Sequence, residues 1–145
     1  MNKISDDILC KVEKPSRYVG GELNQVIKNP KDVDIRFAFC FPDVYEVGMS
    51  HLGTRILYHT INLREDTYCE RTFAPWPDME ELMRKNNIPL YTLETKDSLD
   101  KFDILGFTLQ YEMSYTNILN MLDMSGIPFR ASERGEDAPI IMAGG

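Results

Sequence analysis

Three short stretches of the chain each follow an apolar run and carry hydrogen-bonding side chains, glycine or both. Carboxylates, hydroxyls and amides can hydrogen-bond a ligand, and glycine lacks a Cβ, so the backbone can approach a bulky group closely. Because ligands of open α/β sheets sit at the carboxyl ends of the strands, we expect these stretches to form a binding site. The candidate site residues are Asp43, Tyr45, Gly48, Thr108, Gln110, Gly144 and Gly145.

The first of these stretches belongs to the pattern around which the chain is organised. Residues Ile35–Phe41 form a short apolar run between Asp34 and Pro42, which is typical of a buried strand. A loop is predicted over Pro42–Met49, followed by Ser50 as the N-cap of a helix through about Asn62. Strand, loop and helix in this order are the first half of a βαβ unit.

The rest of the chain repeats this alternation of strands and helices. Alternation predicts an α/β fold in which a parallel sheet of about five strands, in the order 2-1-3-4-5, lies between two layers of helices. This is a three-layer, Rossmann-like (flavodoxin-like) architecture. The further predicted elements are a short helix capped by Ser5, strand Tyr68–Phe73, helix Met79–Asn86, strand Leu90–Leu93, strand Phe102–Leu109, helix Tyr115–Met124 and strand Pro139–Met142.

Composition excludes several classes of partner. The net charge is -7, which argues against nucleic acid because phosphate binding needs a cationic surface. No apolar run approaches the roughly 20 residues of a membrane helix. The N-terminus, MNKISDDILC, carries acidic residues where a signal peptide is basic. We therefore expect a cytoplasmic protein with neither nucleic acid nor a membrane as partner.

The residues that most often bind metals are dispersed. Cys10, Cys40 and Cys69 are widely spaced and form no CxxC or CxxxCxxC cluster, so neither a zinc nor an iron–sulfur site is predicted. His51 and His59 lie eight residues apart, whereas a helical metal pair is usually four apart. We interpret the cysteines as structural and both histidines as polar surface residues.

The three candidate stretches resemble the motifs of the cobalamin-binding domain. That family has Asp-x-His-x-x-Gly after its first strand, Ser-x-Leu after a later strand and Gly-Gly after the last. Here the first motif appears as DVYEVG at 43–48, the second as TLQ at 108–110 and the third as Gly144-Gly145. Tyr45 therefore stands where the family has histidine, and Thr108 keeps only the hydroxyl of the second motif.

A closer resemblance is to the N-terminal domain of radical S-adenosylmethionine (radical SAM) proteins that carry a cobalamin-binding-like domain. It covers most of the chain. The stretches that carry it are RYVGGELN at 17–24, FAFCFPDVYEVGMSHLGTRILYH at 37–59, FAPWPDMEEL at 73–82 and GFTLQYEMSYTNILNMLDMSGIP at 106–128.

This resemblance implies a role in binding cobalamin. In the cobalamin family the histidine imidazole is the lower ligand of cobalt, whereas a neutral phenol, with a pKa of about 10, is a poor ligand. The resemblance thus implies a corrinoid positioned without a protein lower ligand, with Tyr45 shielding its lower face or hydrogen-bonding a water. The Thr108 hydroxyl would contact the nucleotide tail of the cofactor, and its alternative role is that of a capping hydroxyl.

The resemblance also implies a domain arrangement. Residues 1–30 would form an N-terminal helix and arm, and residues 31–145 the cobalamin-binding-like domain, as a fragment cut before a radical SAM domain. That downstream domain of the same parent chain would be the partner, and would hold S-adenosylmethionine and a 4Fe–4S cluster. We expect no catalysis by this chain alone.

Two other functions are considered. The same fold can have lost cobalamin and act as a structural, docking or substrate-covering module, with Tyr45 and Trp76 as packing residues. A flavodoxin-like phospho-receiver or flavin mononucleotide carrier is disfavoured, because the later strand ends in Thr108-Leu109-Gln110 rather than an acceptor aspartate. In addition, Asp43 and Glu46 would repel a phosphate.

Overall fold

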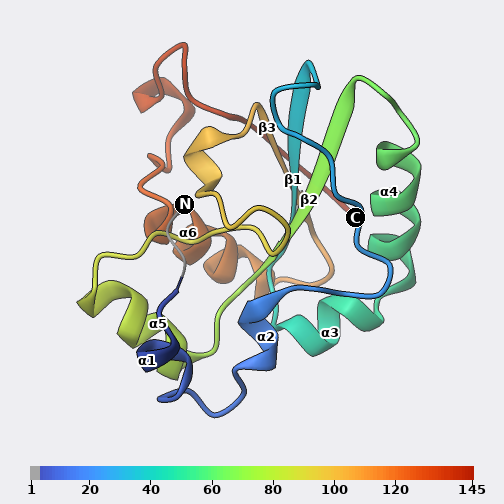
Figure 1. The fold of residues 1–145 in the computed structure, drawn as a ribbon. Coiled ribbons are helices and arrows are strands. Elements are labelled where there is room, and N and C mark those ends of the chain that lie inside the picture. The colour runs from blue at the N-terminus through green and yellow to red at the C-terminus, as the bar shows by residue number, and fades with distance from the viewer. Residues whose placement is uncertain (1–3) are drawn as a thin grey trace.

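Four parallel strands form one sheet in the order β2-β1-β3-β4 (Figure 1). The structure, a computed structural model, describes residues 4–145. Strand order reverses between β1 and β3, because the chain leaves β1 to form β2 on one side and then returns to form β3 on the other. The strands are β1 (Ile35–Phe41), β2 (Thr67–Phe73), β3 (Ile104–Thr108) and β4 (Ile140–Gly144).

Helices cover both faces of the sheet, so the prediction of an α/β fold with a parallel sheet between helical layers is confirmed (Figure 1). Helices α1, α5 and α6 lie on one side, and α4 lies on the other. The helices are α1 (Asp6–Leu9), α2 (Ser16–Val19), α3 (Tyr45–Ser50), α4 (Leu52–Asn62), α5 (Pro77–Lys85), η1 (Leu99–Lys101), α6 (Ser114–Met124) and η2 (Ala131–Glu133).

Alternate residues of β1 divide the apolar interior into two clusters, as strand geometry requires. Ala38 and Cys40 face the cluster formed with α5 and α6. Phe39 and Phe41 face the opposite cluster, which includes Tyr58 of α4. Since β1 is buried on both faces, its sequence is apolar except for Arg36, which explains why its predicted bounds, Ile35–Phe41, are confirmed.

The segment after β1 differs from its prediction. The predicted loop Pro42–Met49 contains α3, and Ser50 is the last residue of that helix rather than an N-cap. Backbone dihedrals of φ -77° and ψ 118° at His51 break the helix and start α4 in a new direction. His51 is the N-cap of α4, since its Nδ1 accepts a hydrogen bond from the Thr54 backbone amide at 3.3 Å.

The predicted strand Leu90–Leu93 is wrong, so the sheet has four described strands rather than about five. Only Tyr91 forms an isolated antiparallel bridge, to Ser98. The Leu93 amide instead donates to the Arg71 carbonyl oxygen at 2.8 Å, which places this segment along the outer edge of β2. With no strand inserted, β3 pairs directly with β1. The relative order β2-β1-β3-β4 otherwise follows the predicted pattern.

Edge strand β2 is buried along its whole length although it carries two charged residues. The Arg71 Nε donates to Glu94 Oε1 at 2.8 Å, and the two side chains are 2% and 0% exposed. On the other face, the Arg36 guanidinium contacts Glu70 Oε1 at 2.6 Å. Buried charges are tolerated when paired and hydrogen-bonded. The segment after α5 covers this edge and supplies Glu94 for Arg71, whereas Arg36 of β1 neutralises Glu70.

Smaller differences concern the ends of elements. Helix α5 begins at Pro77, whose missing N–H suits the first turn, whereas Met79 was predicted. Helix α6 begins at Ser114, one residue before the predicted start at Tyr115. Gly126, with φ at +67°, follows the C-cap Ser125, as expected where a helix ends at glycine. Strand β4 continues to Gly144, so this residue lies in the sheet rather than in a loop.

Candidate functional site

A crevice of about 190 Å³ lies where the chain leaves β1 and β3. This is the point of the sheet at which strand order reverses, the usual place for a ligand in an open α/β sheet. Its walls are mainly apolar and aromatic, with a few polar groups, as in small-molecule sites. The lining residues are Phe41, Pro42, Asp43, Val47, His51, Gln110, Tyr111 and Ser114.

Two predicted site residues, Asp43 and Gln110, therefore line the same crevice although they come from different loops. The Tyr111 hydroxyl donates to Asp43 Oδ2 at 3.2 Å and links the two loops. The Asp43 charge raises the pKa of the Tyr111 hydroxyl, so the phenol stays protonated at neutral pH. Asp43 Oδ1 accepts from the Val44 backbone amide at 2.7 Å, which fixes the carboxylate at this edge.

Two hydroxyls at the end of β3 and the start of α6 are buried without a hydrogen-bond partner among the described residues. They are Thr108 Oγ1 and Ser114 Oγ, in residues that are 7% and 1% exposed. Ser114 lines the crevice itself. An unpaired buried hydroxyl costs free energy, so two of them on adjoining elements indicate a place where a ligand or an ordered water completes the hydrogen bonding.

The terminal glycines lie beside this region. Gly144 is the parallel register partner of Thr108, and its carbonyl oxygen accepts from the Leu109 amide at 2.8 Å. A Cβ on Gly144 would meet no atom within 4 Å, so the backbone there is open to a neighbouring group. A Cβ on Gly145, by contrast, would overlap the Leu109 carbonyl oxygen, and this close backbone approach requires glycine.

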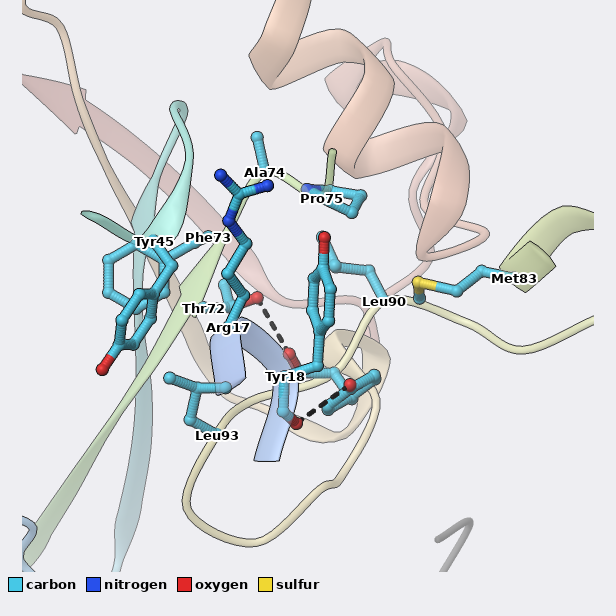
Figure 2. A pocket seen from close by; sticks show the side chains of 11 residues that line it. Arg17, Tyr18, Tyr45, Thr72, Phe73, Ala74, Pro75, Met83, Leu90 and Leu93 are labelled. Atoms are coloured by element: carbon cyan, nitrogen blue, oxygen red, sulfur yellow. Dashed lines mark hydrogen bonds between the residues drawn. The ribbon is translucent and has the colours of Figure 1, made fainter. Parts of the chain in front are cut away.

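Tyr45 does not reach the crevice and lines a different cavity, shown in Figure 2. That cavity holds only about 20 Å³, the space of a single water molecule. The Tyr45 hydroxyl hydrogen-bonds Glu22 of the N-terminal arm and points away from the other labelled side chains. Its ring packs edge-on against Phe73 with the centroids 5.5 Å apart. Burial, followed by the bond to Glu22, raises the pKa of Tyr45 to about 12.

Gly48 has a structural reason to be glycine. It is buried in α3, and a Cβ at this position would overlap the Phe73 ring and lie 3.0 Å from Cγ of Phe41. The backbone approaches the aromatic cluster between α3 and the sheet rather than a ligand. The structure therefore brings Asp43, Gln110, Thr108 and Gly144 to one end of the sheet, and separates Tyr45 and Gly48 from them.

We predict that Gly48→Ala lowers the free energy of unfolding by about 1–3 kcal/mol, because the added methyl group overpacks two buried rings. The better helix propensity of alanine offsets less than about 1 kcal/mol of this cost. Gly135→Ala is the control, since a Cβ there meets nothing within 4 Å. Urea unfolding monitored by circular dichroism measures both variants; equal stability of the two would contradict the packing account.

Three polar residues of the crevice, His51, Tyr111 and Ser114, are not among the candidate site residues predicted from the sequence. The sequence predicts His51 to be a polar surface residue, and Tyr111 and Ser114 lie between the predicted strand Phe102–Leu109 and the predicted helix Tyr115–Met124. Their only sequence signal is position, since each follows shortly after a candidate motif at a strand end. The break between α3 and α4, which turns His51 toward the crevice, has no marker in the sequence.

No metal centre is built from the described residues. Residues 4–145 contain no group of three or more histidine, cysteine or acidic side chains that could hold a metal ion. The three cysteines are free, with Cys40 and Cys69 buried. Burial raises the pKa of both buried thiols, which disfavours the thiolate that a metal or cluster requires. These cysteines do not fit an iron–sulfur cluster.

The chain is an α/β domain with a crevice at the strand-order reversal. Residues 53–145 match the family described as the N-terminal region of radical SAM proteins, and the chain belongs to this family. Membership implies S-adenosylmethionine and an iron–sulfur cluster in the parent protein. No curated protein matches the chain. No solved structure matches it either. Among the described residues, none of the helices has the length and apolar character to cross a membrane.

Proposed function

We propose that this chain is the N-terminal accessory domain of a radical SAM enzyme, and that its crevice between β1 and β3 binds a ligand used by the parent protein. The radical SAM domain lies downstream in the same parent chain and holds the cluster, since the cysteines here do not fit one. This domain binds and positions the ligand of the parent protein, and it carries no catalytic residue. A cytoplasmic location agrees with three free cysteines.

Two buried hydroxyls without a partner carry this proposal: Ser114, which lines the crevice, and Thr108, at the end of β3. Thr108 and Ser114 keep polar groups where apolar ones would be more stable, and selection retains such groups mainly where they have a function. Asp43 makes the crevice favourable for neutral or cationic groups and unfavourable for phosphate. The volume of about 190 Å³ admits a group of one or two fused rings.

Cobalamin is the ligand that the resemblance to cobalamin-binding domains suggests. One observation in the structure favours cobalamin and another argues against it. The support is that Asp43, Gln110, Thr108 and Gly144 lie at one end of the sheet. The opposition is Tyr45, which stands in the histidine position but lines a separate small cavity and hydrogen-bonds Glu22 with its hydroxyl. The described residues therefore do not fit a corrinoid with Tyr45 as lower ligand, and the crevice admits only part of a corrinoid.

The hydroxyls give the test of the ligand site. In the parent enzyme, we expect Thr108→Val and Ser114→Ala to keep or raise stability, by up to about 1–2 kcal/mol, because each removes an unpaired buried oxygen. The same variants should lower turnover by about tenfold, the cost of one hydrogen bond to a ligand. Thr72→Val is the control: its hydroxyl donates to the Tyr91 carbonyl oxygen at 2.9 Å, so stability falls while the crevice is untouched. Variants that are more stable and fully active would contradict the proposal.

A separate experiment decides on the corrinoid. The chain is mixed with hydroxocobalamin and desalted, and the visible absorbance of the protein fraction is recorded. If cobalamin is the ligand, about one equivalent is retained and Tyr45→Phe leaves the spectrum unchanged, because Tyr45 is no lower ligand. Absence of retained colour favours the alternative, in which the same fold serves as a docking or substrate-covering module.

A further inference from the structure

Strand β4 has an exposed surface that differs from the rest of the sheet. It pairs only with β3, so its outer edge carries backbone N–H and C=O groups without a strand partner among the described residues. Ile140 and Met142 are 67% and 54% exposed. Strands of parallel sheets are usually covered on both faces, and open apolar edges promote unwanted pairing. This combination is typical of a surface that another segment covers.

The register shows which face is open. Ile140 is aligned with Ile104, which is aligned in turn with Phe37 of β1. Phe37 packs against the cluster on the α4 side of the sheet, and Ile141 packs against the opposite cluster with α6. Helix α4 itself lies against β1 and β2. The α4 side of the sheet is therefore covered over β1 and β2 and exposed at β4.

We infer that this β4 surface, formed by Ile140, Met142 and the open strand edge, is where the polypeptide that follows this region in the parent radical SAM protein docks. The inference rests on the proposed function for the existence of that polypeptide. The β4 surface would then link this domain to the radical SAM domain. Docking there places the following domain beside Gly144, the register partner of Thr108 at the end of β3.

Other occupants and other surfaces are less favoured by the charges and hydrogen bonds. A second copy of this chain would bring two bodies of net charge -7 together, and like charges oppose that association. Leu52 and Ile56 on α4 are exposed to the same degree as the β4 side chains, at 66% and 54%. They lie on a helix, whose backbone groups bond within the helix, whereas the β4 edge offers unpaired backbone groups as well.

The matched exposures give a controlled experiment in the parent protein. Ile140→Asp and Met142→Asp are compared with Leu52→Asp and Ile56→Asp by amide hydrogen exchange over residues 140–144. We expect slow exchange at β4 in the unmodified parent, an acceleration of about tenfold or more with either β4 substitution, and no acceleration with either α4 substitution. The 145-residue chain alone should exchange at β4 as fast as the substituted parent.

Other results of the exchange experiment would overturn either the docking surface or the proposed function. Equal exchange at β4 in the parent and in the chain alone would overturn the docking surface, as would equal effects of the β4 and α4 substitutions. A dimer of the chain alone with a protected β4, detected by light scattering, would assign the surface to a second copy. Protected β4 in a parent that reconstitutes no iron–sulfur cluster would keep the surface and overturn the proposed function instead.

Discussion

Glu94→Ala is expected to lower the free energy of unfolding by about 3–5 kcal/mol, the cost of leaving one member of a buried ion pair without its partner. Glu94 accepts from the Arg71 backbone amide at 2.7 Å and from its Nε at 2.8 Å. The remaining guanidinium would keep only weak partners, including the face of the Tyr58 ring 4.0 Å away. A loss of this size is a large part of the stability of most domains.

The reason for this cost is burial rather than the strength of the pair. Burial raises the pKa of Glu94 even though Arg71 acts in the opposite direction, which shows how unfavourable the site is for an isolated charge. The double variant Arg71→Met/Glu94→Leu should therefore regain most of the lost stability, since it removes both charges together. Urea unfolding measures both variants. A single Glu94→Ala variant as stable as the double variant would contradict this explanation.

The second large effect is expected for Glu70→Ala, at about 3 kcal/mol. Glu70 is fully buried and accepts hydrogen bonds from Arg36 at 2.6 Å and from the Thr92 hydroxyl at 2.6 Å. The Thr95 amide and hydroxyl also donate to it, at 3.1 and 2.6 Å. The expected loss is at the lower end of the range for a broken buried ion pair, because Arg36 keeps its second ion pair, with Asp97 at 3.0 Å.

An exposed pair provides the control for this second prediction. Glu80 contacts Arg84 at 2.9 Å, but both side chains are partly exposed, at 26% and 43%. Exposed pairs contribute about 0–1 kcal/mol, so Glu80→Ala should change the unfolding free energy little. Thermal unfolding of the two variants under the same buffer conditions compares them directly. Similar losses for Glu70→Ala and Glu80→Ala would mean that the buried network contributes no more than a surface contact.

Two apolar segments show where the fold could and could not be predicted from the sequence. The run Ile35–Phe41 has the composition of a strand buried on both faces, and β1 has the predicted bounds. Leu90–Leu93 has a similar apolar composition, but its backbone makes isolated hydrogen bonds, to Arg71 of β2 and to Met124, rather than a strand ladder. Its place is set by charges on β2, and which acid pairs with which arginine depends on the tertiary fold.

The candidate site could likewise be predicted in part from the sequence. Strand ends in a parallel sheet meet at one edge, and the structure brings Asp43 and Gln110 to one crevice there. The direction of the Tyr45 side chain depends on Glu22, which lies in an arm with no regular secondary structure. The pattern Asp-x-Tyr-x-x-Gly thus locates the loop but not its tyrosine. Gly48 likewise fits a motif, yet its reason is contact with Phe73.

The most direct test of the central claim, that the crevice between β1 and β3 is a ligand site, is an experimental electron-density map of the parent protein. The account predicts continuous density for a bound molecule between Asp43 and Gln110, with an atom in hydrogen-bonding distance of Ser114 Oγ. A crevice that contains only ordered water, or that the Tyr111 side chain fills, would contradict it.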